Sequence, residues 1–137
     1  MTQALNALSD KIIGSAIAVH RELGPGLLES AYDACFAYEL LTRHLTIERQ
    51  KPVPLVYQKQ RLDLGFRIDF LVENEIIVEV KARERLDPVH SAQLLSYLRL
   101  SGCTLGLLLN FNVMRLADGG IKRVVNGFRE DSSPPIL

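Results

Sequence analysis

The sequence predicts an α/β protein in which a mixed β-sheet with a central hairpin is flanked by helices. Three segments carry apolar side chains at helical spacing, at residues 3–23, 27–43 and 87–101. Residues 67–81 have the pattern of two alternating strands joined by a polar turn. Residues 103–111 form a nearly continuous apolar run, which is typical of a strand covered on both faces. We expect this strand to lie beside residues 76–81 after a right-handed helical crossover.

The first two predicted helices are separated by Gly24-Pro25, because glycine past a helix end followed by proline is a common stop. Glu29 lies in the first turn of the second helix, where the helix dipole favours a negative charge. Tyr32 is on the same helical face. Glu29 therefore either complements the helix end or contributes to a site, and Tyr32 is expected to pack with its hydroxyl satisfied.

Residues 47–50 and 53–57 indicate two short strands, followed by a polar turn. Two prolines interrupt these strands, which suits the edge of a sheet. Three basic residues lie in or after this segment, namely Lys51, Lys59 and Arg61. They either protect a solvated edge, which is the stronger expectation, or line a path for nucleic acid.

The central hairpin is expected to turn at Glu73-Asn74-Glu75. One face then carries six apolar side chains: Ile68, Phe70, Val72, Ile76, Val78 and Val80. The other face pairs Asp69 with Glu79 and Arg67 with Lys81. A slip of one residue would move every side chain to the opposite face, so the buried apolar face selects this register.

In this register the Cβ atoms of Asp69 and Glu79 are roughly 4.5–5.5 Å apart. Repulsion would keep one carboxyl protonated unless a cation bound both. Mg²⁺ takes oxygen ligands from one or two carboxylates, and Lys81 lies on the same face as Glu79. This combination suits phosphodiester hydrolysis, because a metal polarises a phosphoryl oxygen and lowers the pKa of bound water. The lysine would position the water or offset developing charge.

Asp69, nine intervening residues and then Glu79-Val80-Lys81 resemble the motif of the PD-(D/E)xK nuclease superfamily, with Ile68 in place of the proline. The stretch Gly26-Leu27-Leu28-Glu29-Ser30-Ala31-Tyr32 resembles the motif of the small GxxExxY family within it. The resemblance covers nearly the whole chain. It implies a restriction-endonuclease-like three-layer core and a nuclease that uses Mg²⁺, with Mn²⁺ able to replace it.

The resemblance also implies roles for single residues. Asp69, Glu79 and the carbonyl of Val80 would bind the metal, and Lys81 would orient the attacking water. Glu29 would reach toward the metal from its helix, with Gly26 allowing a tight turn beside it.

The third predicted helix begins with Asp87 as N-cap and Pro88 in the first turn. Gln93 and Tyr97 share one of its faces. This pair resembles the Gln-x-x-x-Tyr motif of RecB-like members of the superfamily, in which the glutamine lies close to the active-site lysine. His90 is expected to be structural rather than catalytic.

Three arginines are candidates for contacts with the phosphates of nucleic acid: Arg67, Arg83 and Arg85. A charged surface loop explains Arg83 and Arg85 equally well. Residues 113–116 and 121–125 suggest a final hairpin, unless the first of them is a loop. We assign residues 1–128 to one domain and residues 129–137 to a loose C-terminal tail.

The 137-residue chain has 16 basic and 16 acidic residues, and this balance argues against tight nonspecific binding of nucleic acid. Cys35 and Cys103 lie in apolar patterns and are expected to be reduced, buried thiols of a cytoplasmic protein. No apolar run has the length of a membrane span, so no membrane partner is expected.

Two functions fit the sequence. The first is a Mg²⁺-dependent nuclease acting on DNA, or on RNA, with a homodimer expected because cutting both strands often needs two subunits. The second is a catalytically silent binding module that keeps the fold, with a protein partner supplying target recognition. The complete acid and lysine set favours the first function. A third interpretation, an exposed acid pair merely bridged by Lys81, requires that the hairpin is not buried.

Overall fold

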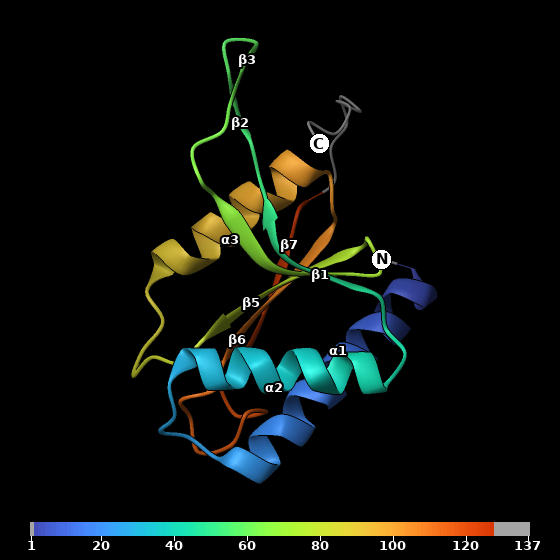
Figure 1. Ribbon diagram of the computed structural model, residues 1–137, viewed down its shortest axis with the longest axis vertical. Helices are drawn as coiled ribbons and strands as arrows, with labels where there is room; N and C mark the ends of the chain where they lie inside the picture. The colour runs from blue at the N-terminus through green and yellow to red at the C-terminus, as the bar shows by residue number, and fades with distance from the viewer. Residues whose placement is uncertain (1, 128–137) are drawn as a thin grey trace.

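The computed structural model describes residues 2–127 (Figure 1). The elements are α1 (Gln3–Leu23), α2 (Glu29–Thr42), β1 (Ile47–Pro52), β2 (Leu55–Tyr57), β3 (Gln60–Leu62), β4 (Arg67–Val72), β5 (Ile76–Lys81), α3 (Pro88–Ser101), β6 (Leu105–Asn110) and β7 (Ile121–Val125). Five strands form a mixed sheet in the order β1-β4-β5-β6-β7, and β2 pairs only with β3 in a second sheet. This is the α/β architecture that the sequence predicts.

Helices cover both faces of the five-stranded sheet and make three layers (Figure 1). Helices α1 and α2 pack on one face over the larger apolar cluster, in which the ring of Phe36 meets that of Phe70 edge to face at 5.1 Å. Helix α3 packs on the other face over a smaller cluster that includes Leu71 and Leu98. The arrangement agrees with the expected restriction-endonuclease-like core.

Strand β6 is buried along its whole length and pairs in parallel with β5, as its apolar run predicts. The connecting helix α3 follows Asp87 and ends at Gly102, whose φ of 76° is left-handed. Gly106 lets α3 approach the sheet closely, because a Cβ there would lie 2.8 Å from a methyl carbon of Leu94. A glycine at this position therefore fixes the distance between α3 and the strand beside the candidate site.

The central hairpin has the predicted register near its turn, where Val72 pairs with Ile76 and Phe70 with Val78. The β4–β5 ladder ends at that second pair. The predicted ladder pairs beyond it, Ile68 with Val80, Asp69 with Glu79 and Arg67 with Lys81, are therefore not formed. Ile68 also leaves the predicted face and joins the cluster under α3. The two strands separate at Asp69, and this separation creates the candidate site.

Strand β1 lies at the edge of the sheet, as expected, and extends to Pro52. After Pro52 the chain leaves the sheet as a projecting hairpin, which we call the arm (residues 53–66; Figure 1). The arm contains β2 and β3, and its two-residue tip is formed by Gln58 and Lys59, both with positive φ. The predicted polar turn is therefore present.

Of the two alternatives for residues 113–116 the loop is confirmed, and β7 pairs with β6 instead of forming a terminal hairpin. The expectation that both cysteines are buried is wrong, because Cys35 is exposed and Cys103 is half-buried, although both are free thiols. Tyr32 and Phe36 take the inward face of α2 and leave Cys35 on the outer face.

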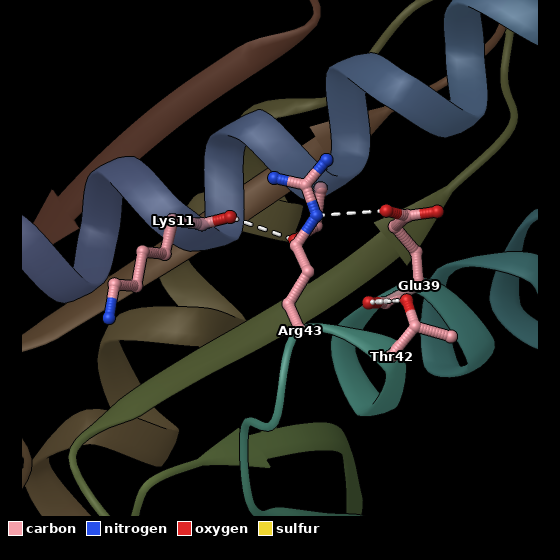
Figure 2. Close-up of polar contacts among 5 residues, drawn as sticks. Lys11, Glu39, Thr42 and Arg43 are labelled. Atoms are coloured by element: carbon pink, nitrogen blue, oxygen red, sulfur yellow. Dashed lines mark hydrogen bonds and ion pairs between the residues drawn. The ribbon is translucent and has the colours of Figure 1, made fainter.

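Arg43, the residue that follows α2, lies beside α1 (Figure 2). Its Nε donates to the carboxylate of Glu39 at 2.8 Å, and the Thr42 hydroxyl donates to the Glu39 carbonyl. A Cβ at Gly14 of α1 would lie 3.3 Å from a guanidinium nitrogen of Arg43, so the small residue makes room for this side chain. The two hydrogen bonds lie within the end of α2, and Gly14 leaves room for this end beside α1.

Among residues 2–127, none of the helices offers an apolar stretch suited to crossing a lipid bilayer. The predicted tail, residues 129–137, lies outside the described residues.

Candidate active site

The two central acids lie where β4 and β5 separate, and each binds the backbone of the opposite strand. The amide of Asp69 donates to a Glu79 carboxylate oxygen at 2.7 Å, and the amide of Val80 donates to a carboxylate oxygen of Asp69 at 2.8 Å. The carboxylates thus take the place of carbonyl acceptors at the end of the ladder. These two hydrogen bonds fix the positions of both side chains where the two strands separate.

Both acids are held in surroundings that disfavour their charges. Glu79 is only 5% exposed, and burial raises its pKa from 4.5 to about 8, with the negative charge of Asp69 acting in the same direction. The pKa of Asp69 is also raised, first by burial. The amide donors and the nearby charge of Lys81 oppose these shifts without cancelling them. The pair is therefore unstable in its doubly ionised form unless a cation is present.

Further charges come from α2. Glu29 is the first residue of that helix, and its charge raises the pKa of both Asp69 and Glu79. Asp33 lies one helical turn later, forms an ion pair with Arg49 of β1 and also raises the pKa of Asp69. The structure therefore brings Glu29 within electrostatic range of the acid pair.

The turn before α2 is fixed by Tyr32, which is fully buried. Its hydroxyl accepts from the amide of Leu27 at 3.1 Å and donates to the carbonyl of Gly24 at 2.5 Å. Its ring stacks on Phe111 with centroids 4.7 Å apart. Gly26 has a φ of 101°, a conformation that favours glycine. Tyr32 and Gly26 thus set the position at which Glu29 begins its helix.

Gln50 of β1 contributes an amide to the site. Its Nε2 donates to Asp69 at 3.4 Å, a long hydrogen bond, and its backbone has a φ of 52°. A positive φ is uncommon for glutamine, and such strain concentrates at functional sites. This distortion occurs on β1 directly opposite the point at which β4 leaves β5.

Asn110 fixes the segment that follows Lys81. Its buried side chain accepts from the amide of Arg83 at 3.0 Å and donates to the Arg83 carbonyl at 2.9 Å. The amide of Phe111 binds the Lys81 carbonyl at 2.9 Å. Lys81 is half-buried, and its charge lowers the pKa of both acids. These hydrogen bonds hold the chain in place from Lys81 to Arg83, where β5 has already ended.

The arginines suggested as phosphate contacts are all exposed, as that role requires: Arg67, Arg83 and Arg85. Arg67 begins β4 and pairs with Pro52 of the edge strand. Arg83 and Arg85 lie in the loop between β5 and α3. Arg67 therefore reaches solvent from the start of β4, and the other two arginines reach it just after the end of β5.

Two residues of α3 near the site, Tyr97 and Gln93, differ in their exposure to solvent. Tyr97 is 6% exposed, and burial raises its pKa, with the charges of Glu79 and Asp69 adding to the shift. Gln93 is exposed, and within residues 2–127 no described hydrogen bond joins it to Lys81. The Nδ1 atom of His90 accepts a hydrogen bond from the amide of Asp87 at 3.1 Å, so His90 forms part of the N-terminal cap of α3.

The oxygen atoms of Asp69, Glu79 and Val80 are the candidate metal ligands of this site. Among the described residues, no group of three or more His, Cys, Asp or Glu side chains is arranged to hold an ion. Mg²⁺ does not require such a group, because it binds through one or two carboxylates and keeps several waters. Asp69, Glu79 and the Val80 carbonyl offer only oxygen, which suits Mg²⁺ or Mn²⁺. The half-buried Asp69 and the buried Glu79, both with raised pKa values, are therefore suited to a hard divalent cation.

Sequence reasoning missed three residues of this site. Asp33 could have been found, since it lies four residues after Glu29 on the same helical face. Asn110 had a weaker signal as the polar residue that ends an apolar run. Gln50 had none, because its place opposite Asp69 depends on the pairing of β1 with β4.

Comparison with families of known proteins places this geometry in context. A family model described as the PD-(D/E)XK nuclease superfamily matches residues 6–124. Neither the curated proteins nor the solved structures contain a match. The matched segment includes both acids, Lys81 and the helices on either side of the sheet. Because it covers most of the sequence, the chain belongs to the PD-(D/E)XK nuclease superfamily.

Proposed function

We propose that this protein is a Mg²⁺-dependent nuclease that hydrolyses phosphodiester bonds, with DNA as the favoured substrate and RNA as the alternative. We also propose that it belongs to the GxxExxY family within its superfamily. The observation that carries the proposal is the pair of half-buried Asp69 and buried Glu79, whose pKa values are both raised and whose positions are fixed by opposite-strand amides. Such a pair gains most from a ligand that stabilises its ionised form.

Asp69, Glu79 and the carbonyl of Val80 would hold the cation. Bound Mg²⁺ would polarise a phosphoryl oxygen and lower the pKa of a coordinated water. Lys81 would orient the attacking water and offset charge that develops on the phosphate. Before this chemistry Glu79 must release its proton, since its pKa of about 8 keeps it protonated in the metal-free protein at neutral pH.

Other residues would assist from both layers. Glu29 would act from α2 and Gln93 from α3, where Gln93 can reach substrate because it is exposed. Gly26, Tyr32 and Tyr97 would support their positions. The exposed arginines Arg67, Arg83 and Arg85 would bind the phosphates on either side of the scissile bond.

The test is calorimetric titration of Mg²⁺ and of Mn²⁺, followed by incubation of the same samples with DNA and RNA. Asp69→Asn and Glu79→Gln should lose metal binding and cleavage together. Glu75→Gln is the matched control, because Glu75 is an exposed acid in the turn of the same hairpin. Metal binding without cleavage of any substrate would favour the silent binding module, and cleavage by either site variant would refute the assignment.

We further propose that the enzyme is cytoplasmic and acts as a homodimer, with a protein partner contributing target recognition. Sedimentation equilibrium of the purified protein tests the dimer, which a single monomeric species would exclude. Affinity capture with Asp69→Asn, which should hold its target without cutting it, tests the partner.

A further inference from the structure

The arm carries an excess of positive charge in a chain whose net charge is zero. The arm itself contains two basic residues, Lys59 and Arg61, and one acid, Asp63, and Lys51 and Arg67 lie on the strands at its base. Lys51 is paired with Glu48, whereas Lys59 and Arg61 are exposed near the tip. A local concentration of positive charge on a projecting hairpin is suited to the phosphates of nucleic acid.

The arm also exposes apolar side chains. Five of its residues are in this group: Val56, Tyr57, Leu62, Leu64 and Phe66. The arm stands apart from the five-stranded sheet (Figure 1), and an isolated two-stranded hairpin is only marginally stable in water. These observations indicate a surface that a partner covers. A second copy of the chain would bring two positively charged arms together, so charge favours a polyanion.

A hollow of about 280 Å³ lies between the base of the arm and α3. It is lined by Leu55, Phe66, Gln93, Ser96, Tyr97 and Leu100. Phe66 is partly exposed there, and Tyr97 lies within electrostatic range of Asp69 and Glu79. The hollow therefore combines aromatic and aliphatic walls with a position beside the acid pair.

We propose that the arm and α3 together bind a single strand of nucleic acid, with Lys59 and Arg61 on its phosphates and one base in the hollow. The inference rests on the proposed nuclease function and specifies its substrate. An aromatic-lined hollow accepts a base only when that base is unstacked, which a single strand allows and a paired duplex resists. The strand would then pass the acids as it leaves the hollow.

The phosphate contacts are tested by fluorescence anisotropy with a short strand in deoxy and ribo forms, in EDTA so that no cleavage occurs. The variant Lys59→Gln/Arg61→Gln should bind about tenfold more weakly at 0.1 M salt. Its plot of log affinity against log salt should be shallower by about 1.4, because each phosphate contact on a single strand contributes about 0.7. The control Lys11→Gln/Arg21→Gln removes two exposed charges from α1 and should match the parent.

The base contact is tested with two variants of the hollow and with an abasic strand of equal length. Phe66→Leu removes the ring but keeps apolar volume, and Ser96→Leu fills the hollow from an exposed helical position. The parent should bind the normal strand about tenfold more tightly than the abasic strand. Each variant should lose this preference, and urea unfolding should show that each remains folded.

Three results would overturn the proposal: parent binding to a blunt duplex as tight as to the single strand, arm variants that keep the parental salt dependence, or a dimer that the arm variants convert to monomer. The last would make the arm an interface between copies. Titration of Mg²⁺ is independent of these measurements. A protein that binds strands through the arm but binds no Mg²⁺ would instead refute the nuclease assignment and leave the arm proposal standing.

Discussion

Replacing Glu79 with glutamine should remove a strong pH dependence from the stability of the metal-free protein. The pKa of Glu79 is about 8 in the folded chain instead of 4.5, because burial and the charge of Asp69 disfavour ionisation. The folded protein therefore holds a proton that the unfolded chain releases. Stability from this group is complete below about pH 4.5 and is lost as the pH rises through 8. Glutamine can still accept the Asp69 amide and does not ionise.

The size of the effect follows from the two pKa values. A difference of about 3.5 pH units, at roughly 1.36 kcal/mol for each unit, corresponds to about 5 kcal/mol. About 3 kcal/mol of this would be lost between pH 4.5 and pH 7, and nearly all of it by pH 9. Glu79→Gln should therefore be more stable than the parent by about 3 kcal/mol at pH 7, a large share of the stability of a small domain.

Urea unfolding in EDTA at pH 5, 7 and 9 measures this difference directly. The parent should lose stability over the series relative to Glu79→Gln, and Glu75→Gln should follow the parent because its acid is exposed at the turn. Parallel stability curves for the parent and Glu79→Gln would refute the reasoning, since they would show that Glu79 ionises as easily in the folded chain as in the unfolded one.

Three further predictions follow from the same geometry. Mg²⁺ should bind about tenfold more tightly at pH 7 than at pH 6, with a smaller gain from pH 7 to 8 as Glu79 approaches its pKa, because binding displaces one proton from Glu79; a pH-independent affinity in calorimetry would contradict this. Lys81→Met should keep its Mg²⁺ affinity and lose roughly 100-fold or more in cleavage rate, and an unchanged rate would exclude Lys81 from the mechanism. Tyr32→Phe should lower the free energy of unfolding by about 1–3 kcal/mol, because two backbone groups lose the hydroxyl. The exposed Tyr38 on the same helix is the control, and Tyr38→Phe should leave the urea midpoint unchanged.

The elements that could be predicted from sequence are those in which one face is buried, because burial then fixes the spacing of the apolar residues. The helices and β6 meet this condition, and the turn of the central hairpin does so because a slip would expose its apolar face. The predicted register fails beyond Phe70 and Val78, where side-chain carboxylates replace carbonyls as acceptors. Periodicity carries no information on such a replacement, so the move of Ile68 to the other core was not foreseen.

The residues of the candidate site also fall into a group that could be predicted from sequence and a group that could not. Asp69, Glu79 and Lys81 could be grouped from the predicted hairpin, and they lie near one another although the ladder ends before Asp69. Residues that join the site through tertiary pairing could not be grouped, as Gln50 shows with its positive φ and its place on a distant strand. The expected proximity of Gln93 to Lys81 rested on a motif alone, and in the structure Gln93 is exposed and lines the hollow.

The energetics of the acid pair decide between a functional site and a structural bridge. Each carboxylate accepts one backbone amide, and a hydrogen bond to a charged group contributes about 1.5–3 kcal/mol. The pKa of Glu79 is raised to about 8 even though this hydrogen bond lowers it, so ionisation of Glu79 in the metal-free fold still costs about 5 kcal/mol after the bond is included. A neutral amide or hydroxyl at position 79 could accept the same bond without that cost. Glu79 is also buried, so it is not the exposed, Lys81-bridged acid that a structural role requires. A carboxylate here is therefore favourable only when a cation stabilises its charge.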